Sequence, residues 1–69
     1  MGEQKKIRSE MLDQAIRESE RAQQGYEQLT ESQKNEYGAY IESAEQQATK
    51  QERIKKVLPL IERGAGLND

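Results

Sequence analysis

Apolar residues recur at steps of three and four along most of the chain, the spacing of one face of an α-helix. The first such stripe contains Leu12, Ala15, Ile16, Ser19, Ala22 and Tyr26. It predicts a helix over residues 9–28 with Ser9 as its N-cap, because a serine oxygen accepts a bond from an unpaired backbone N–H of the first turn. Met11 widens the stripe at its start, and Gly25 weakens the last turn.

Two capping boxes, in which Ser or Thr is followed three residues later by Glu or Gln, predict the starts of two more helices. They are Thr30 to Gln33 and Thr49 to Glu52, and the helices are predicted over residues 31–47 and 50–63. The apolar stripes behind these boxes are Tyr37, Tyr40, Ile41, Ala44 and Ala48 in the first helix, and Ile54, Val57, Leu58 and Ile61 in the second.

Three residues modify these helices. Gly38 lies inside the middle stripe, which predicts a close approach between that helix and a neighbouring helix. Pro59 lies inside the last stripe, where it removes a backbone donor, so a kink near residues 55–58 or an outright break is predicted. Gly64 is a natural helix stop in left-handed conformation.

Together these patterns predict an all-α fold, a small antiparallel three-helix bundle with helices at about 9–28, 31–47 and 50–63, the last kinked near Pro59. Residues 1–8 are expected to be a flexible N-terminus, residues 9–63 the domain, and residues 64–69 a loose tail. The predicted core consists of Leu12, Ile16, Tyr26, Leu29, Tyr37, Tyr40, Ile41, Ile54, Val57, Leu58 and Ile61.

The composition argues against catalysis. The 69 residues include no His and no Cys, which removes the most common general base and the best transition-metal ligands. The carboxylates follow no calcium-loop spacing and the glycines form no phosphate-binding loop. We therefore predict a protein that is not an enzyme, with no metal and no cofactor. The charged N-terminus and the lack of a long apolar run predict no membrane insertion and a cytoplasmic location.

Charge is unevenly spread, although the net charge is only −2. Residues 9–49 carry nine acids and three bases, whereas residues 50–63 carry two acids and five bases. The basic last helix is interpreted first as a counter-charge to the acidic middle of the same molecule. Arg53, beside the core stripe, is expected to pair with a glutamate of the middle helix.

Two binding hypotheses remain beside that structural one. In the first, a protein partner or a second copy of the chain covers a patch made by Ile7, Leu60 and Leu67, and the possible interaction surface is Leu60, Arg53, Lys56 and Arg63. In the second, nucleic acid binds Lys50, Arg53, Lys56 and Arg63. The negative net charge and the lack of glycine in the junction before the last helix disfavour the second hypothesis.

The second half of the chain carries an ordered set of cap and core residues: Leu29-Thr30-Glu31-Ser32 to Lys34, then Glu36-Tyr37, Tyr40-Ile41, Ala44, Thr49-Lys50, Arg53-Ile54 and Gly64. With Tyr26 ahead of Leu29, this order resembles the C-terminal helical region of the YdeI/OmpD-associated (bacteriocin-protection) family over about residues 22–64.

The resemblance implies a helical fold and a bacterial accessory role linked to stress or to the envelope, with no known chemistry. The chain departs from the family pattern at Tyr40, where Trp is common, at Glu45, where Lys often follows the alanine, and at Pro59. Family members usually carry a larger N-terminal domain where this chain has a single predicted helix, so a function of that domain is not expected to transfer.

Overall fold

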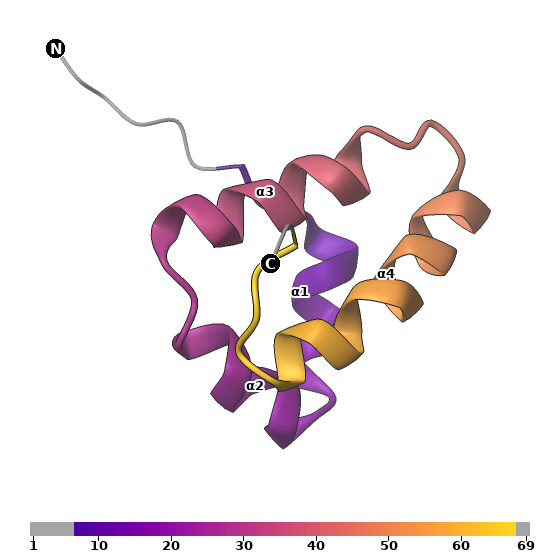
Figure 1. Cartoon of the computed structure of the whole chain (residues 1–69). Coiled ribbons are helices and arrows are strands. Elements are labelled where there is room, and N and C mark those ends of the chain that lie inside the picture. Colours follow the sequence, from indigo (N-terminus) through magenta and orange to yellow (C-terminus); the bar gives the residue numbers. More distant parts are fainter. Residues whose placement is uncertain (1–6, 68–69) are drawn as a thin grey trace, which may run out of the picture.

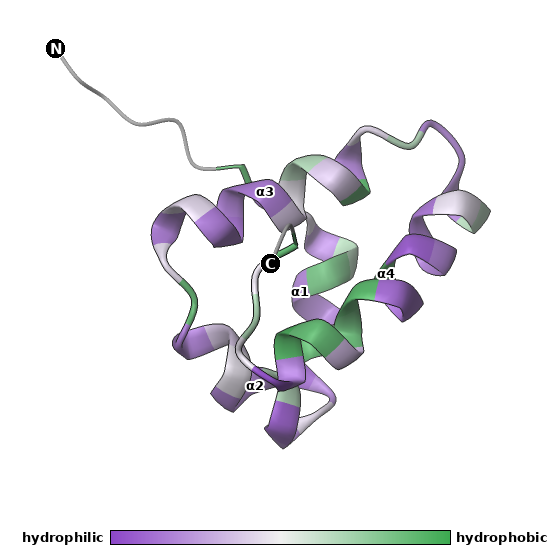
Figure 2. Ribbon diagram, in the orientation of Figure 1, coloured by the Kyte–Doolittle hydropathy of each residue, from purple (hydrophilic) through white to green (hydrophobic). Residues whose placement is uncertain are grey.

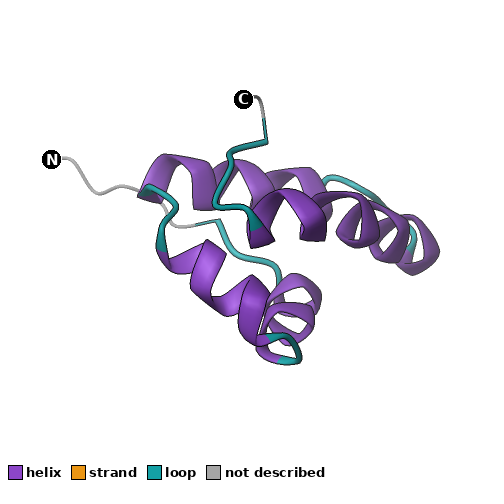
Figure 3. Cartoon of the chain, turned by 60° about the horizontal axis from the view of Figure 1, so that its bottom comes forward, coloured by secondary structure: helices purple, strands orange, loops and turns teal. Residues whose placement is uncertain are grey.

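The computed structural model describes residues 7–67, which form four α-helices and no strand (Figures 1 and 3). The helices are α1 (Glu10–Arg17), α2 (Glu20–Glu27), α3 (Glu31–Glu42) and α4 (Gln47–Glu62). The all-α prediction is therefore confirmed, and the prediction of three helices is wrong by one. Of the predicted flexible N-terminus and loose tail, residues 1–6 and 68–69 lie outside the described part of the chain.

The additional helix arises because the predicted helix 9–28 divides at Ser19. This residue is extended, with φ −133° and ψ 120°, and its Oγ accepts a bond from the Ala22 N–H at 3.3 Å. The Gln23 side-chain amide donates to the Arg17 carbonyl at 2.8 Å, which ties the two helices across the turn. A serine that bonds to nearby backbone in this way competes with the helix ladder. Ser9 caps α1 as predicted, accepting from the Leu12 N–H at 3.4 Å.

The capping box at the start of α3 is confirmed, and the second predicted box is wrong. The Gln33 N–H donates to Thr30 Oγ1 at 3.1 Å, and the Thr30 N–H donates to Gln33 Oε1 at 2.9 Å. By contrast, α3 ends at Glu42 and α4 already begins at Gln47, so Thr49 lies inside the first turn of α4. The N-cap of α4 is Gln46, which makes no side-chain capping bond.

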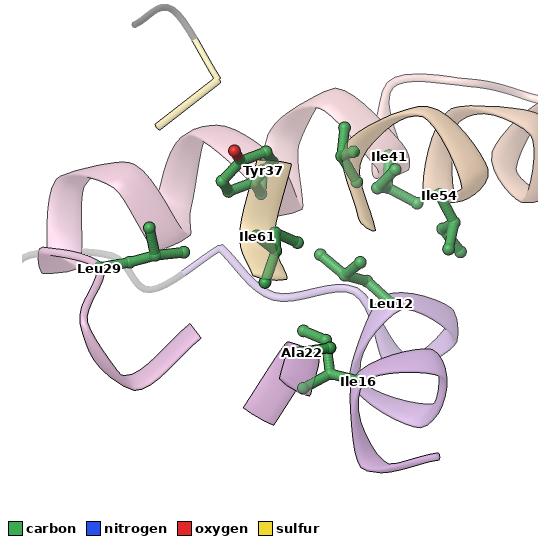
Figure 4. Packing of buried hydrophobic residues seen from close by; sticks show 9 residues of the cluster. Leu12, Ile16, Ala22, Leu29, Tyr37, Ile41, Ile54 and Ile61 are labelled. Atoms are coloured by element: carbon green, nitrogen blue, oxygen red, sulfur yellow. The ribbon is translucent and has the colours of Figure 1, made fainter. Parts of the chain in front are cut away.

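The core forms around α4, which packs against α1, α2 and α3. The apolar residues of α4 are concentrated in its C-terminal half (Figure 2), and Ile54, Val57 and Ile61 are buried. Tyr37, Ile41 and Ile61 are fully buried, and Ile61 lies between Tyr37 and Ala22 in the close-up view (Figure 4). Full burial of one such side chain stabilises the fold by about 1.5–3 kcal/mol. The buried apolar residues are Leu12, Ile16, Ala22, Leu29, Tyr37, Ile41, Ala44, Ile54, Val57 and Ile61.

Two glycines permit close packing of backbone. A Cβ placed on Gly25 would lie 1.7 Å from the Ile61 carbonyl oxygen, so α2 touches the backbone of α4 at this point. A Cβ on Gly38 would lie 2.2 Å from the Ile7 carbonyl oxygen. The predicted close approach at Gly38 is therefore present, but its partner is the extended segment before α1 and not a helix.

The end of α4 differs from the prediction in two ways. The helix continues through Pro59 to Glu62, so the predicted alternative of a break is wrong. Pro59 and Lys55 are exposed, so water can reach the carbonyl that proline leaves without a donor. Gly64 adopts the predicted left-handed conformation, with φ 70°.

Residues 64–67 then fold back onto the domain, although they were expected to be loose. The Ala65 N–H donates to the Leu60 carbonyl at 3.0 Å, and the Tyr37 hydroxyl donates to the Ala65 carbonyl at 2.6 Å. Gly66 is buried, and Leu67 packs against the core. This segment therefore closes the domain over α3 and α4.

Candidate interaction surface

Four residues singled out from the sequence, Arg53, Lys56, Leu60 and Arg63, follow one side of α4 at steps of three, four and three. The structure gives them different roles. Lys56 and Arg63 are exposed, whereas Arg53 and Leu60 are half-buried. We call Lys56, Leu60 and Arg63 the basic stripe, because the exposed Lys56 and Arg63 lie on one side of the helix with the half-buried Leu60 between them.

Arg53 holds the end of α3. Its Nη1 donates to the Tyr40 carbonyl and to Ser43 Oγ, each at 2.7 Å, and its guanidinium lies 4.8 Å from the centre of the Tyr40 ring. The last carbonyls of a helix lack intrahelical donors and carry partial negative charge, so a cation there is favourable. The structural role predicted for Arg53 fits this geometry, but its predicted glutamate partner is wrong.

The other bases of α4 divide into one paired residue and three unpaired ones. Lys50 Nζ lies 3.5 Å from Glu42 Oε1, an ion pair that joins α4 to the end of α3. Within residues 7–67, the side chains of Lys55, Lys56 and Arg63 form no hydrogen bond or ion pair. The counter-charge interpretation therefore accounts for Lys50. It does not account for Lys56 and Arg63, which belong to the basic stripe.

The predicted apolar patch of Ile7, Leu60 and Leu67 is wrong. Leu60 and Leu67 pack against the core, and Ile7, 37% exposed, is the one large hydrophobic residue among residues 7–67 that is classed as exposed. The chain turns back at the left-handed Gly64, and this return brings Leu67 against the core.

A shallow groove between α1 and α4 was not anticipated from the sequence. Met11 and Ala15 of α1 and Ile54 of α4 contribute its apolar lining, and its volume is ≈ 270 Å³. The polar lining consists of Gln14, Glu18 and Gln51. The one available signal was Met11, which widens the apolar stripe of α1 beyond the face that packs against the core. We call this hollow the α1/α4 groove.

The outward side of α1 is hollowed as well, and it is mainly acidic. Glu10, Asp13 and Arg17 line a second depression together with Met11 and Gln14. Adding Glu18 from the groove gives this side of the helix three acids and one base. No polar group here is arranged as a nucleophile with a base, so the depression offers charge and shape and no evident chemistry.

No group of three acidic, His or Cys side chains in residues 7–67 is placed to hold a metal ion. Burial raises the pKa of the Tyr26 hydroxyl, with smaller contributions from Asp13 and Glu31 and an opposing one from Arg8. A raised pKa keeps this phenol protonated at neutral pH, which fits a half-buried packing residue. The predicted absence of enzyme activity, metal and cofactor stays a prediction.

None of the helices in residues 7–67 combines the length and the apolar character that crossing a membrane requires.

Comparison with known proteins places the fold in a family. No curated protein and no solved structure matches the chain. The family model described as bacteriocin-protection, YdeI or OmpD-associated matches residues 9–64. This span covers α1 to α4 and ends at the left-handed Gly64. It therefore begins earlier than the sequence resemblance, which covers residues 22–64, and adds α1 and the start of α2 to the matched part. The chain therefore belongs to the YdeI/OmpD-associated (bacteriocin-protection) family.

Proposed function

We propose that this domain is a non-catalytic protein-interaction module that docks an acidic protein surface on the basic stripe. The observation that carries the proposal is the state of Lys56 and Arg63, which are exposed and unpaired in the described domain while Lys50 and Arg53 serve the α3–α4 junction. Surface cations that the fold does not use are available to a partner.

The geometry of the stripe supports a specific contact. Lys56 and Arg63 are seven residues apart, so about 10 Å of helix separates their Cα atoms, with Leu60 between them. Helix α4 is held by three neighbouring helices, so the two charges are presented on a rigid support. An acidic surface with two carboxylates at that spacing and an apolar side chain between them would match the stripe in charge and in shape.

The family description adds support, since it speaks of association with OmpD and of bacteriocin protection, and names no reaction. A role exerted through association fits a chain without His and Cys. Nucleic acid is the competing class of ligand for the same cations. The net charge of −2 disfavours it, because phosphate binding depends on a surplus of bases.

The test compares two double variants in a pull-down from native lysate, with and without nuclease. Lys56→Glu with Arg63→Glu reverses the basic stripe, and Arg21→Glu with Lys55→Glu makes the same charge change at exposed positions elsewhere. We expect a protein partner that withstands nuclease and is lost only with the stripe variant. Equal retention by both variants would contradict the proposal. Nuclease-sensitive recovery with a steep salt dependence would assign the stripe to nucleic acid instead.

A further inference from the structure

Ile7 is an exposed apolar side chain on a fixed segment. Its backbone N–H donates to Asn35 Oδ1 at 3.0 Å, and its carbonyl lies against Gly38. The next residue, Arg8, reinforces this anchor by donating to Asn35 Oδ1 at 2.7 Å and to Glu31 Oε2 at 2.6 Å. A hydrophobic residue that is both exposed and held in place is pre-organised for a contact, since little ordering entropy is lost on binding.

The α1/α4 groove is a complementary receptor for one aliphatic side chain. Its volume of ≈ 270 Å³ lies below the usual range of small-molecule sites, and its apolar residues are Met11, Ala15 and Ile54. Ile7 of the same copy does not line the groove, because Asn35 and Glu31 hold residues 7–8 on α3. The apolar lining is thus open to an apolar group from another molecule.

Charge points to the N-terminal segment of a second copy as the occupant. Residues 1–8 carry three bases and one acid, and Lys5 and Lys6 directly precede Ile7 in the sequence. The groove is lined by one acid, Glu18, and the depression beside it on α1 is lined by Glu10 and Asp13 with one base, Arg17. An isoleucine preceded by two lysines therefore complements a partly apolar groove with acids in and beside it.

Ile7 lies just before the N-terminal end of α1, and the groove runs along α1 from Met11 in the first turn to Glu18 at the C-cap. Ile7 and Met11 are four residues apart, so their Cα atoms are separated by about 14 Å at most. A two-fold axis near the N-terminal end of α1 would let each copy donate one Ile7 and receive the other, and such a contact closes at two copies. We propose that the chain forms a symmetric dimer in which Ile7 of each copy enters the α1/α4 groove of the other.

The first experiment measures self-association of the full chain by sedimentation over the micromolar to millimolar range. We expect a monomer–dimer equilibrium that Ile7→Asp weakens about tenfold or more, because each dimer loses two apolar contacts. Gln24→Asp, which adds the same charge at an exposed position of α2 outside both the groove and the basic stripe, serves as the matched surface control and leaves the equilibrium unchanged. A chain that stays monomeric, or a dimer indifferent to Ile7→Asp, overturns the proposal.

The second experiment tests the register without depending on affinity. The chain has no native cysteine, so single-cysteine variants can be mixed and oxidised. Ile7→Cys mixed with Gln51→Cys, at the groove rim, should cross-link severalfold faster than Ile7→Cys mixed with Lys56→Cys, on the basic stripe. Equal cross-linking rates for the two mixtures would refute the contact. In the first experiment, an Ile7→Asp variant that is folded but no longer dimerises would support it.

Discussion

At the scale of single residues, the crossing of α2 and α4 depends on a missing side chain. Gly25 is buried against the Ile61 carbonyl, and the space that a methyl group would need is filled by backbone, which cannot move aside as a flexible side chain can. The helix-weakening effect of glycine is therefore outweighed by the packing that it allows.

Gly25→Ala is predicted to destabilise the domain by about 1–3 kcal/mol, even though alanine favours helix by about 1 kcal/mol, because the two helices must separate. Urea unfolding followed by circular dichroism measures the change. Gln24→Ala, at the exposed neighbouring position, should alter stability by less than about 0.5 kcal/mol. A stabilised Gly25→Ala variant would show that α2 and α4 do not touch here.

The buried hydroxyl of Tyr26 should make the stability of the domain fall at high pH. Burial raises the pKa of its hydroxyl above the ordinary 10.0, so between the unfolded and folded pKa values the folded state binds more protons. The contribution of Tyr26 to stability is therefore fully present below pH 10.0 and is lost as the pH rises through the folded pKa.

Tyr26→Phe removes this titration. The urea concentration at the unfolding midpoint should therefore fall less between about pH 8 and about pH 11 for Tyr26→Phe than for the parent. The comparison between proteins cancels the titration of lysines, which both share. The same loss in both proteins would mean that Tyr26 is not shielded from solvent in the folded state.

At the scale of helices, Arg53 joins α3 to α4, because this side chain of α4 donates hydrogen bonds to the C-terminal end of α3. Its donors reach the Tyr40 carbonyl and Ser43 Oγ, so α3 ends with bonds supplied by α4. The basic residues of α4 are consequently not equivalent, although they share a charge and a helix.

Arg53→Met is predicted to lower the free energy of unfolding by about 1.5–3 kcal/mol, the range for losing hydrogen bonds to a charged group. Lys56→Met should change it by less than about 0.5 kcal/mol, because Lys56 is exposed and unpaired in the described domain. Chemical denaturation of the two variants measures both values. Equal losses would show that the contacts of Arg53 contribute nothing in solution.

The boundaries of the helices show which features could be predicted from the sequence. Ser9 and Thr30 lie directly before apolar stripes and cap as expected. Ser19 also fits an apolar stripe of helical period, so the pattern places it inside a helix, and only the tertiary turn shows that it caps a new one. Thr49 has the residues of a capping box, but α4 begins two residues earlier, where Arg53 and the buried Ala44 fix the turn.

At the scale of the whole molecule, the predicted core was more accurate than the predicted surface. Burial follows helical period, so residues such as Leu12, Val57 and Ile61 could be assigned from spacing. Exposure depends on which segments cover the helices. Residues 64–67 return onto the domain through the bond from the Tyr37 hydroxyl to the Ala65 carbonyl and bring Leu67 against the core, an arrangement that no local pattern encodes.

The small size of the domain makes its stability depend on each core residue. Ile41 is fully buried in α3, in the same core as Ile61 of α4. Ile41→Ala is predicted to cost about 2–5 kcal/mol, from lost transfer energy and the cavity left behind. Globular domains have a total stability of about 5–15 kcal/mol, and small ones lie toward the lower end, so this single change should leave only about 0–3 kcal/mol.

Thermal unfolding monitored by circular dichroism, with Glu36→Ala at an exposed position of α3 as the control, separates this loss from any effect on helix propensity. The control should melt like the parent, whereas Ile41→Ala should melt well below it. If both variants melt like the parent, the four helices do not share one cooperative core, and the rigid support assumed for the basic stripe and for Ile7 would be lost as well.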